Sequence, residues 1–140
     1  MKRVLLTTVA IIVVVTAFVG CNSNKPNGGF DYPLKTLYGT WRITHVEQKD
    51  GTMLNVTTPL AERVFEPTYA TFNPDGTYSG KGYFGNGSGT YKAVGKTITC
   101  FIDGTEYLKY DVLSLSNDQC ELKMYRSGKT FSTKIRCKKQ

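Results

Sequence analysis

Residues able to do acid–base or nucleophilic chemistry are few in this sequence and stand far apart. His45 is the single histidine, and neither a Gly-x-Ser-x-Gly elbow nor a recognisable orienting acid accompanies it. We expect His45 to be a hydrogen-bonded polar group inside the fold, with a catalytic base as the alternative. Glu62 and Glu66 have the four-residue spacing that places two carboxylates on one helix face. Exposed surface charges explain this pair as well as acid–base catalysis does.

Sequence patterns for cofactor and metal binding are equally weak. Residues 80–85 read Gly-Lys-Gly-Tyr-Phe-Gly and match a dinucleotide fingerprint, but the glycine-rich residues after them cannot open a helix. A phosphate group would therefore meet no helix N-terminus. The four cysteines are scattered without a Cys-x-x-Cys spacing, which excludes most zinc motifs. The sequence predicts a protein that is not an enzyme and has neither a cofactor nor a metal site.

The N-terminus has the order of a lipoprotein signal. Lys2 and Arg3 precede an apolar run from Leu5 to Val19, and Gly20 and Cys21 follow it. A spanning helix needs about 20 apolar residues and a stop signal, whereas a polar, flexible stretch comes next here. The ending resembles a bacterial lipobox, so we expect cleavage before Cys21 and acyl chains such as palmitate on its thiol. The alternative is an ordinary signal peptide with a chance cysteine.

Beyond the signal, composition predicts one tethered domain. We expect a signal peptide over residues 1–20, a lipidated flexible tether over residues 21–36 and a folded domain over residues 37–140. Without the signal, 16 Lys and Arg stand against 11 Asp and Glu, a net charge of +5 that is too weak for a nucleic-acid footprint. Asn22 stands where an inner-membrane protein would carry Asp, which favours the outer membrane. The face of that membrane stays open.

Turn signals at short intervals divide the rest of the chain into strands. Asp-Gly and Asn-Gly pairs supply the positive φ angles that tight hairpins require. A short helix is expected at residues 59–66, with Thr58 as its N-cap. The β-branched and aromatic runs between the turns predict strands over 40–46, 68–72, 77–83, 89–94, 97–102, 106–115, 119–126 and 130–136. A meander of about eight antiparallel strands removes its edges by closing, so the predicted fold is all-β, a small up-and-down barrel.

The last hairpin can be placed in register from its turn. A two-residue loop of Gly128 and Lys129 pairs residues whose numbers sum to 257, which sets Cys120 opposite Cys137. Two cysteines at such a position are within reach of a disulfide, and secretion supplies an oxidising compartment. Cys100 would then remain as a single buried thiol.

The motifs together resemble the lipocalin-like lipoproteins of Bacteroidota-type gut bacteria. Gly39-Thr40-Trp41 at the start of the first strand is similar to the lipocalin Gly-x-Trp signature, and Asn73-Pro74-Asp75-Gly76 and the later strands extend the likeness. It covers the chain from about residue 37 to residue 138. The resemblance implies that Trp41 packs across the closed end of the barrel beneath a late arginine, for which Arg136 is the positional candidate. It also implies an apolar interior with room for a ligand.

Eight strands leave an interior that either side chains or one small ligand can fill. Strand parity with Trp41 points Ile43 and His45 inward. Our candidate ligand-binding residues are Trp41, Ile43, His45, Tyr83, Phe84, Tyr91, Ile98 and Tyr110. Packed core is the alternative for all of them.

Two non-enzymatic functions are compatible with this sequence. The first is a monomeric, membrane-anchored envelope protein that binds a small hydrophobic or amphipathic molecule in its barrel. The second is an interaction or inhibitor module whose barrel is filled by side chains and whose loops engage another protein. A basic barrel is a poor match for cationic targets, because like charges slow the encounter.

Overall fold

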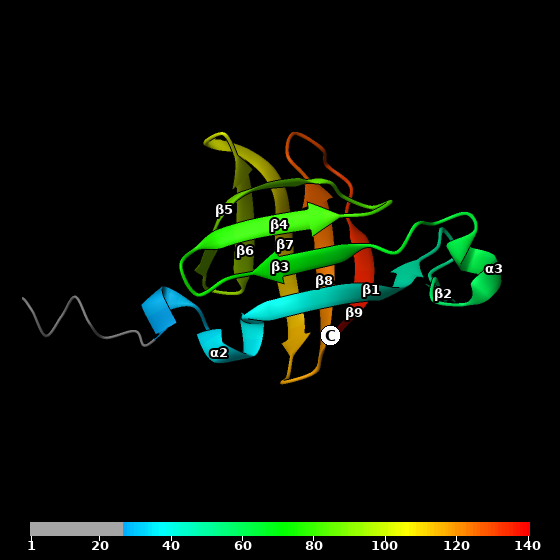
Figure 1. Ribbon diagram of the computed structural model, residues 1–140, viewed down its shortest axis with the longest axis horizontal. Coiled ribbons are helices and arrows are strands. Elements are labelled where there is room, and N and C mark those ends of the chain that lie inside the picture. The colour runs from blue at the N-terminus through cyan, green and yellow to red at the C-terminus, as the bar shows by residue number, and fades with distance from the viewer. Residues whose placement is uncertain (1–26) are drawn as a thin grey trace, which may run out of the picture.

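The computed structural model describes residues 27–140, which form a closed barrel with short helical segments beside it (Figure 1). The expected signal peptide, Cys21 and the first part of the expected tether lie outside the described residues. The helical segments are η1 (Asn27–Gly29), α2 (Leu34–Leu37) and α3 (Pro59–Glu62). The strands are β1 (Gly39–Glu47), β2 (Met53–Asn55), β3 (Tyr69–Phe72), β4 (Thr77–Lys81), β5 (Gly87–Val94), β6 (Thr97–Ile102), β7 (Thr105–Leu115), β8 (Gln119–Arg126) and β9 (Thr133–Lys139).

Eight antiparallel strands make up the wall of the barrel. Neighbours in sequence pair from β3 to β9, and β1 closes the wall by pairing with both β3 and β9. The predicted all-β, up-and-down barrel is therefore confirmed. β2 pairs only with the second half of β1 and was not predicted. It leads into α3, which ends at Glu62, so the expected helix over residues 59–66 is too long.

The Asp-Gly-Thr turns show why the hairpins form where the sequence places them. At the β3–β4 turn, Gly76 has a φ of 88° and its N–H donates to the carbonyl of Asn73. The carboxylate of Asp75 accepts bonds from the backbone N–H and the hydroxyl of Thr77, at 3.0 and 2.7 Å. These bonds to the charged carboxylate lower the pKa of Asp75. A short polar sequence thus fixes both the reversal of the chain and the start of the next strand.

The β8–β9 hairpin confirms the predicted register and corrects its turn. Cys120 lies opposite Cys137, as expected. The strands, however, are joined by residues 127–132 and not by a two-residue loop. The N–H of Lys129 bonds to the carbonyl of Arg126, which centres the turn on Ser127 and Gly128. The predicted pairing is therefore present although the turn from which it was predicted is not.

The expected flexible tether is corrected over its second half. Phe30 is buried and forms a β-bridge with Gly95, and the N–H of Asp31 bonds to the Gly95 carbonyl at 2.8 Å. Leu37 of α2 is also buried in the core. Residues 30–37 therefore pack on the barrel, because two large apolar side chains gain more from burial than a polar linker would.

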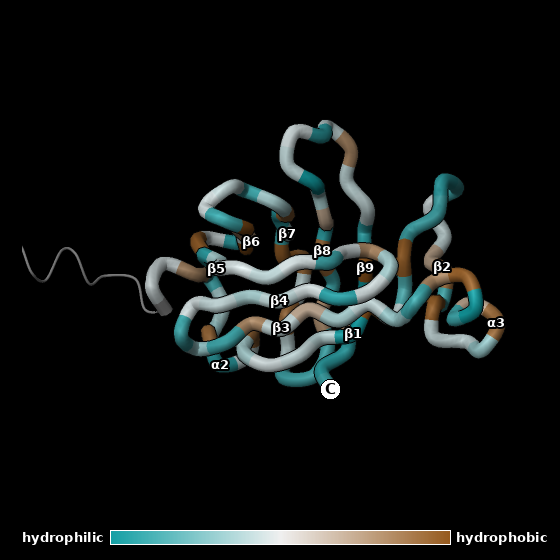
Figure 2. The backbone as a smooth tube through the Cα atoms, turned by 45° about the horizontal axis from the view of Figure 1, so that its top comes forward, coloured by the Kyte–Doolittle hydropathy of each residue, from teal (hydrophilic) through white to brown (hydrophobic). Residues whose placement is uncertain are grey.

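Strand alternation places apolar side chains inside the barrel and polar side chains on its outer surface. Figure 2 shows apolar positions along the strands interrupted by polar ones, as expected when one strand face meets the core and the other meets water. The core has contributions from every wall strand. Ile98, Cys100, Leu108 and Ile135 are its most deeply buried members.

Candidate functional site

A small apolar cavity lies inside the barrel. Its volume is about 30 Å³, far below that of a typical small-molecule site. The wall is formed by Leu37, Trp41, Ile43, Thr68, Tyr69, Ala70, Phe72, Tyr78, Gly80, Phe84, Gly85, Ile98, Tyr110, Val112, Leu115, Cys120, Leu122, Met124, Ile135 and Cys137. Side chains therefore fill most of the interior.

Five of the eight candidate ligand-binding residues line this cavity: Trp41, Ile43, Phe84, Ile98 and Tyr110. Two others do not for simple reasons. Tyr83 is 55% exposed on the loop before β5, and Tyr91 is buried beside Phe72 but outside the cavity wall. Its hydroxyl donates to the carbonyl of Asn73 at 2.8 Å.

The expected inward position of His45 is wrong. The pairing of β1 with β9 shifts between Ile43 and His45, so Thr44 is an extra residue in β1. Such a bulge reverses the parity of the strand, which turns His45 outward and brings Val46 against the core. His45 is half-buried, and its Nδ1 lies 2.9 Å from the hydroxyl of Thr44.

Two tyrosine hydroxyls supply polar groups inside the cavity. Tyr78 and Tyr110 are 2% and 5% exposed and hydrogen-bond to each other. Burial raises the pKa of both phenols, so both remain neutral donors and acceptors. Tyr78 was not among our candidates. The alternation of Thr77–Lys81 after an Asp-Gly turn was the signal for its inward position.

Three aromatic rings gather at the end of the barrel where β4 meets β5. We call Phe65, Tyr83 and Phe84 the aromatic cluster. The ring centres of Tyr83 and Phe84 lie 4.9 Å apart, and Phe65 lies 5.1 Å from Tyr83 and 5.7 Å from Phe84. Phe84 reaches the cavity while Tyr83 meets water, so the cluster joins the interior to the surface. We call this end of the barrel the mouth.

The loop of residues 82–86 is held over the mouth by hydrogen bonds. The N–H of Phe84 donates to the hydroxyl of Thr68 at 3.0 Å, and the N–H of Tyr83 donates to the carbonyl of Glu66 at 3.3 Å. Asn86 bonds to both backbone groups of Gly82. The 82–86 loop therefore covers the mouth in this structure, and hydrogen bonds to a few residues hold it there.

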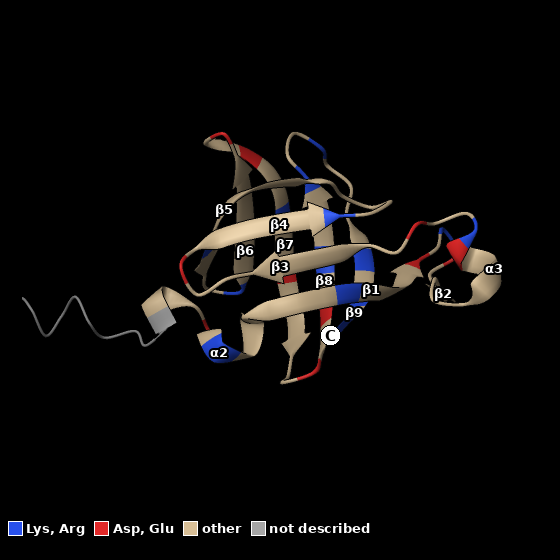
Figure 3. Cartoon of the chain, viewed as in Figure 1, with Lys and Arg blue, Asp and Glu red and all other residues tan. Residues whose placement is uncertain are grey.

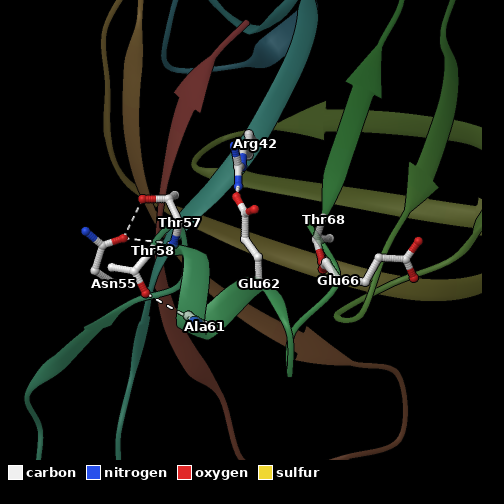
Figure 4. Close-up of polar contacts among 8 residues, drawn as sticks. All are labelled: Arg42, Asn55, Thr57, Thr58, Ala61, Glu62, Glu66 and Thr68. Carbon is white, nitrogen blue, oxygen red and sulfur yellow. Dashed lines mark hydrogen bonds and ion pairs between the residues drawn. The ribbon is translucent and has the colours of Figure 1, made fainter.

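Polar contacts hold the segment from β2 to α3, residues 53–62, beside the mouth (Figure 4). We call this segment the β2–α3 excursion. Arg42 of β1 forms an ion pair with Glu62 at 2.5 Å, and the hydroxyl of Thr58 accepts from the N–H of Ala61, the predicted N-cap. Figure 4 shows Glu66 directed away from Glu62. The two carboxylates therefore do not form the pair that acid–base catalysis would need.

The excursion leaves apolar side chains in contact with water. Leu60 and Val64 are 74% and 63% exposed, and Figure 2 shows hydrophobic positions around α3. Tyr83 is a third exposed apolar residue, and its ring contacts Phe65, the neighbour of Val64 in the chain.

The opposite end of the barrel is closed. The indole N–H of Trp41 donates to the carbonyl of Leu37 at 2.8 Å. Lys139, and not Arg136, supplies the cation over the Trp41 ring. Arg136 lies on the outer face and pairs with Glu121 at 3.0 Å. The strand alternation that points Cys137 inward directs Arg136 outward.

The described cysteines are all buried free thiols. Cys120 and Cys137 face each other across β8 and β9, so their disulfide stays a prediction. Hydrogen bonding to Cys120 and burial raise the pKa of Cys137. Burial raises the pKa of Cys100 to about 12, which leaves it a poor nucleophile.

Comparison with known proteins agrees with this architecture. A lipocalin-like domain matches residues 37–122, from the end of α2 into β8. No curated protein is significantly similar to the chain. Among residues 27–140 no group of three metal-ligating side chains is present, and none of the helices there is long and apolar enough to cross a membrane.

Proposed function

Because the chain belongs to the lipocalin-like domain family, we propose that it is a lipid-anchored, non-enzymatic envelope protein that binds a small apolar or amphipathic molecule at the mouth of its barrel. The family typically consists of binding proteins without catalysis. The observation that carries the proposal is the aromatic cluster, which places Phe84 in the cavity wall and Tyr83 in water. A ligand seated there would exchange contacts with water for contacts with the rings of Phe65 and Tyr83.

The size of the cavity determines how such a ligand would bind. A space of about 30 Å³ does not admit an acyl chain while Phe84 stays in place. Binding therefore requires the 82–86 loop to move, so that part of the ligand replaces the Phe84 ring against the apolar wall. Because this displacement costs part of the gain from burial, we expect micromolar to millimolar affinity.

The test uses Trp41, the single tryptophan, which lines the same cavity from the closed end. Residues 27–140 form a closed barrel with its own core, so a soluble chain from residue 21 with Cys21→Ser serves for binding. We expect laurate, deoxycholate or retinol to change the Trp41 emission saturably and to raise the melting temperature.

Two variants make this test specific. Phe84→Ala enlarges the cavity and should tighten binding at least threefold, since no ring then has to move. Phe101→Ala is the matched control, because Phe101 is a half-buried aromatic residue outside the cavity wall. The proposal is wrong if no probe affects the parent chain or Phe84→Ala, or if both variants change binding equally.

The lipid anchor is proposed from the signal sequence, and the outer membrane from Asn22. Two or three acyl chains would give stable attachment. Cells fed an alkyne analogue of palmitate should label the parent protein and not Cys21→Ser. Equal labelling of the two would contradict acylation of Cys21.

The same small cavity favours a second function, in which the barrel stays filled and its exposed end contacts an envelope protein. Leu60, Val64 and Tyr83 would form the contact. A photo-crosslinking amino acid at Tyr83 should then capture one protein in living cells, and the same group at exposed Val94 should not. This result, with negative amphiphile titrations, would favour the second function.

A further inference from the structure

A polar groove on the outer wall of the barrel contains none of the residues of the aromatic cluster, although Leu115, Cys120 and Cys137 line both this groove and the inner cavity. It crosses β7, β8, β9 and β1, and Thr57 of the β2–α3 connection borders it. Its volume is about 570 Å³, within the range of small-molecule sites in proteins. Figure 3 shows basic positions on β9, the strand that supplies Arg136 and Lys138 to the groove. We call this depression the outer groove.

A row of paired polar residues forms the floor of the outer groove. Ser114 of β7 pairs with Glu121 of β8, and Glu121 pairs with Arg136 of β9. Arg136 pairs in turn with His45 of β1. Four strands thus each contribute one polar side chain to a single line across the wall. Such side chains lie within about 5 Å of their neighbours at Cβ.

Two β-bulges are responsible for this line. Thr44 is the extra residue in β1, and Leu113 is the extra residue in β7, between Val112 and Ser114. Without its bulge each strand would keep its period of two and direct His45 or Ser114 into the apolar core. Bulges that re-aim a side chain are frequent beside functional sites. Here two of them turn polar residues into the same groove.

The outer groove holds hydrogen-bond donors without acceptors. Arg136 uses Nε for its 3.0 Å contact with Glu121, and no group within residues 27–140 accepts from its two Nη atoms. In the same part of the chain, Lys138 Nζ has no acceptor and His45 Nε2 has no partner. Glu121 holds the Arg136 guanidinium in place through Nε, and the edge formed by the two Nη atoms stays available to a ligand. A planar guanidinium edge suits a carboxylate or phosphate.

Charge and lining together indicate the class of ligand. Arg136 and Lys138 outnumber the one carboxylate, that of Glu121. Hydroxyl and amide groups from Thr44, Thr57, Ser114, Ser116 and Gln119 supply the remaining polar surface. We propose that the outer groove binds a small sugar bearing a carboxylate or a phosphate, with the anion on Arg136 and Lys138 and the sugar hydroxyls on the Ser, Thr and Gln side chains.

His45 provides a direct test because it is the single histidine and borders the outer groove. In the soluble chain from residue 21 with Cys21→Ser, its ring signals are followed by carbon–proton correlation NMR. Glucuronate and glucose 6-phosphate are the charged probes, and glucose at equal ionic strength is the neutral one. We expect saturable shifts with at least one charged probe and at least tenfold weaker binding of glucose.

Variants of β9 distinguish specific binding in the outer groove from general attraction of the anionic probe to a basic protein. Arg136→Gln and Lys138→Gln should each weaken binding of the charged probe at least fivefold. Lys134→Gln is the matched control, since Lys134 lies on the same strand outside the groove and should change binding less than twofold. Trp41 emission and the melting temperature show that each variant is folded.

Three results would overturn the proposal. These are no shift with either charged probe, equal binding of glucose, or equal weakening by Lys134→Gln. If Arg136→Gln does not fold, Lys138→Gln decides, because Lys138 is exposed. The mouth proposal is judged by Trp41 emission with amphiphiles, so the failure of one proposal does not mimic the failure of the other.

Discussion

The ammonium group of Lys139 lies 4.9 Å from the centre of the Trp41 ring. It also donates a 2.8 Å hydrogen bond to the carbonyl of Thr36, next to the Leu37 carbonyl that accepts from the indole. The first strand, the last strand and α2 are therefore joined at one point. A cation over an indole ring contributes about 0.5 to 2 kcal/mol to stability.

Replacing Lys139 should accordingly destabilise the closed end. Lys139→Met keeps the length of the side chain and removes the charge and the hydrogen bond, so we expect a loss of about 1–2 kcal/mol in the free energy of unfolding. Urea unfolding followed by Trp41 fluorescence measures it. Lys138→Met, on the exposed face of the same strand, should cost less than about 0.5 kcal/mol. Equal losses would contradict a specific role for Lys139.

The Cys120–Cys137 pair should form a disulfide in the secreted protein. Both thiols are buried on directly opposed residues, and closing a loop of this size would stabilise the fold by about 3 kcal/mol. Peptide mapping of the non-reduced protein should recover the two cysteines in one linked fragment. A fragment linked through Cys100 would refute the assignment.

Stability should fall at alkaline pH. Burial raises the pKa of Cys100 from 9.0 to about 12, so the folded state keeps a proton that the unfolded chain releases above pH 9. The contribution is complete below pH 9 and is lost as the pH rises towards 12, by about 1.4 kcal/mol for each pH unit. Urea unfolding at pH 8, 9 and 10 measures the slope.

The matched variant for this slope is Cys100→Ala, measured with the Cys120–Cys137 disulfide formed so that those thiols do not titrate. We expect a shallower loss of stability between pH 9 and 10 than in the parent chain. Above pH 10 the raised pKa of Tyr110 adds its own loss in both proteins. Parallel curves below pH 10 would show that Cys100 does not control the transition.

Gly82 should be the glycine on which closure of the mouth depends. Its φ is +127°, and an added Cβ would lie 2.3 Å from the carbonyl oxygen of Pro67 and 2.5 Å from Thr68 Cα. Gly82→Ala should therefore cost about 2–4 kcal/mol and displace the 82–86 loop. Gly95→Ala, also at positive φ but with open space around it, should cost about 1 kcal/mol. Thermal unfolding by circular dichroism compares them.

The barrel could be predicted from the sequence because its signals are local. Asp-Gly turns and alternating apolar residues give the strand order. The β8–β9 register agrees with the prediction, although the turn from which it was predicted differs. Positions such as Trp41 and Ile98 follow from the same period of two. These features depend on neighbouring residues alone.

The features that could not be predicted depend on contacts between distant segments. The extra residue Thr44, which turns His45 outward, has no composition signal because any residue can occupy such a bulge. Phe30 stands among polar residues in the sequence, and its burial depends on pairing with the distant Gly95. Lys139 lies over Trp41 where Arg136 was expected, because Lys139 is on the inner face of β9 and Arg136 is on its outer face.

The bridge between Phe30 and Gly95 sets the orientation that an anchored barrel would have. Gly95 lies in the β5–β6 turn, and successive turns of an up-and-down barrel alternate between its ends, so this turn is opposite the β4–β5 loop of the mouth. Only eight residues lie between Cys21 and Phe30, a reach of at most about 30 Å. An acylated Cys21 would thus keep the closed end towards the bilayer, and the mouth would collect its ligand from the aqueous side instead of from the membrane.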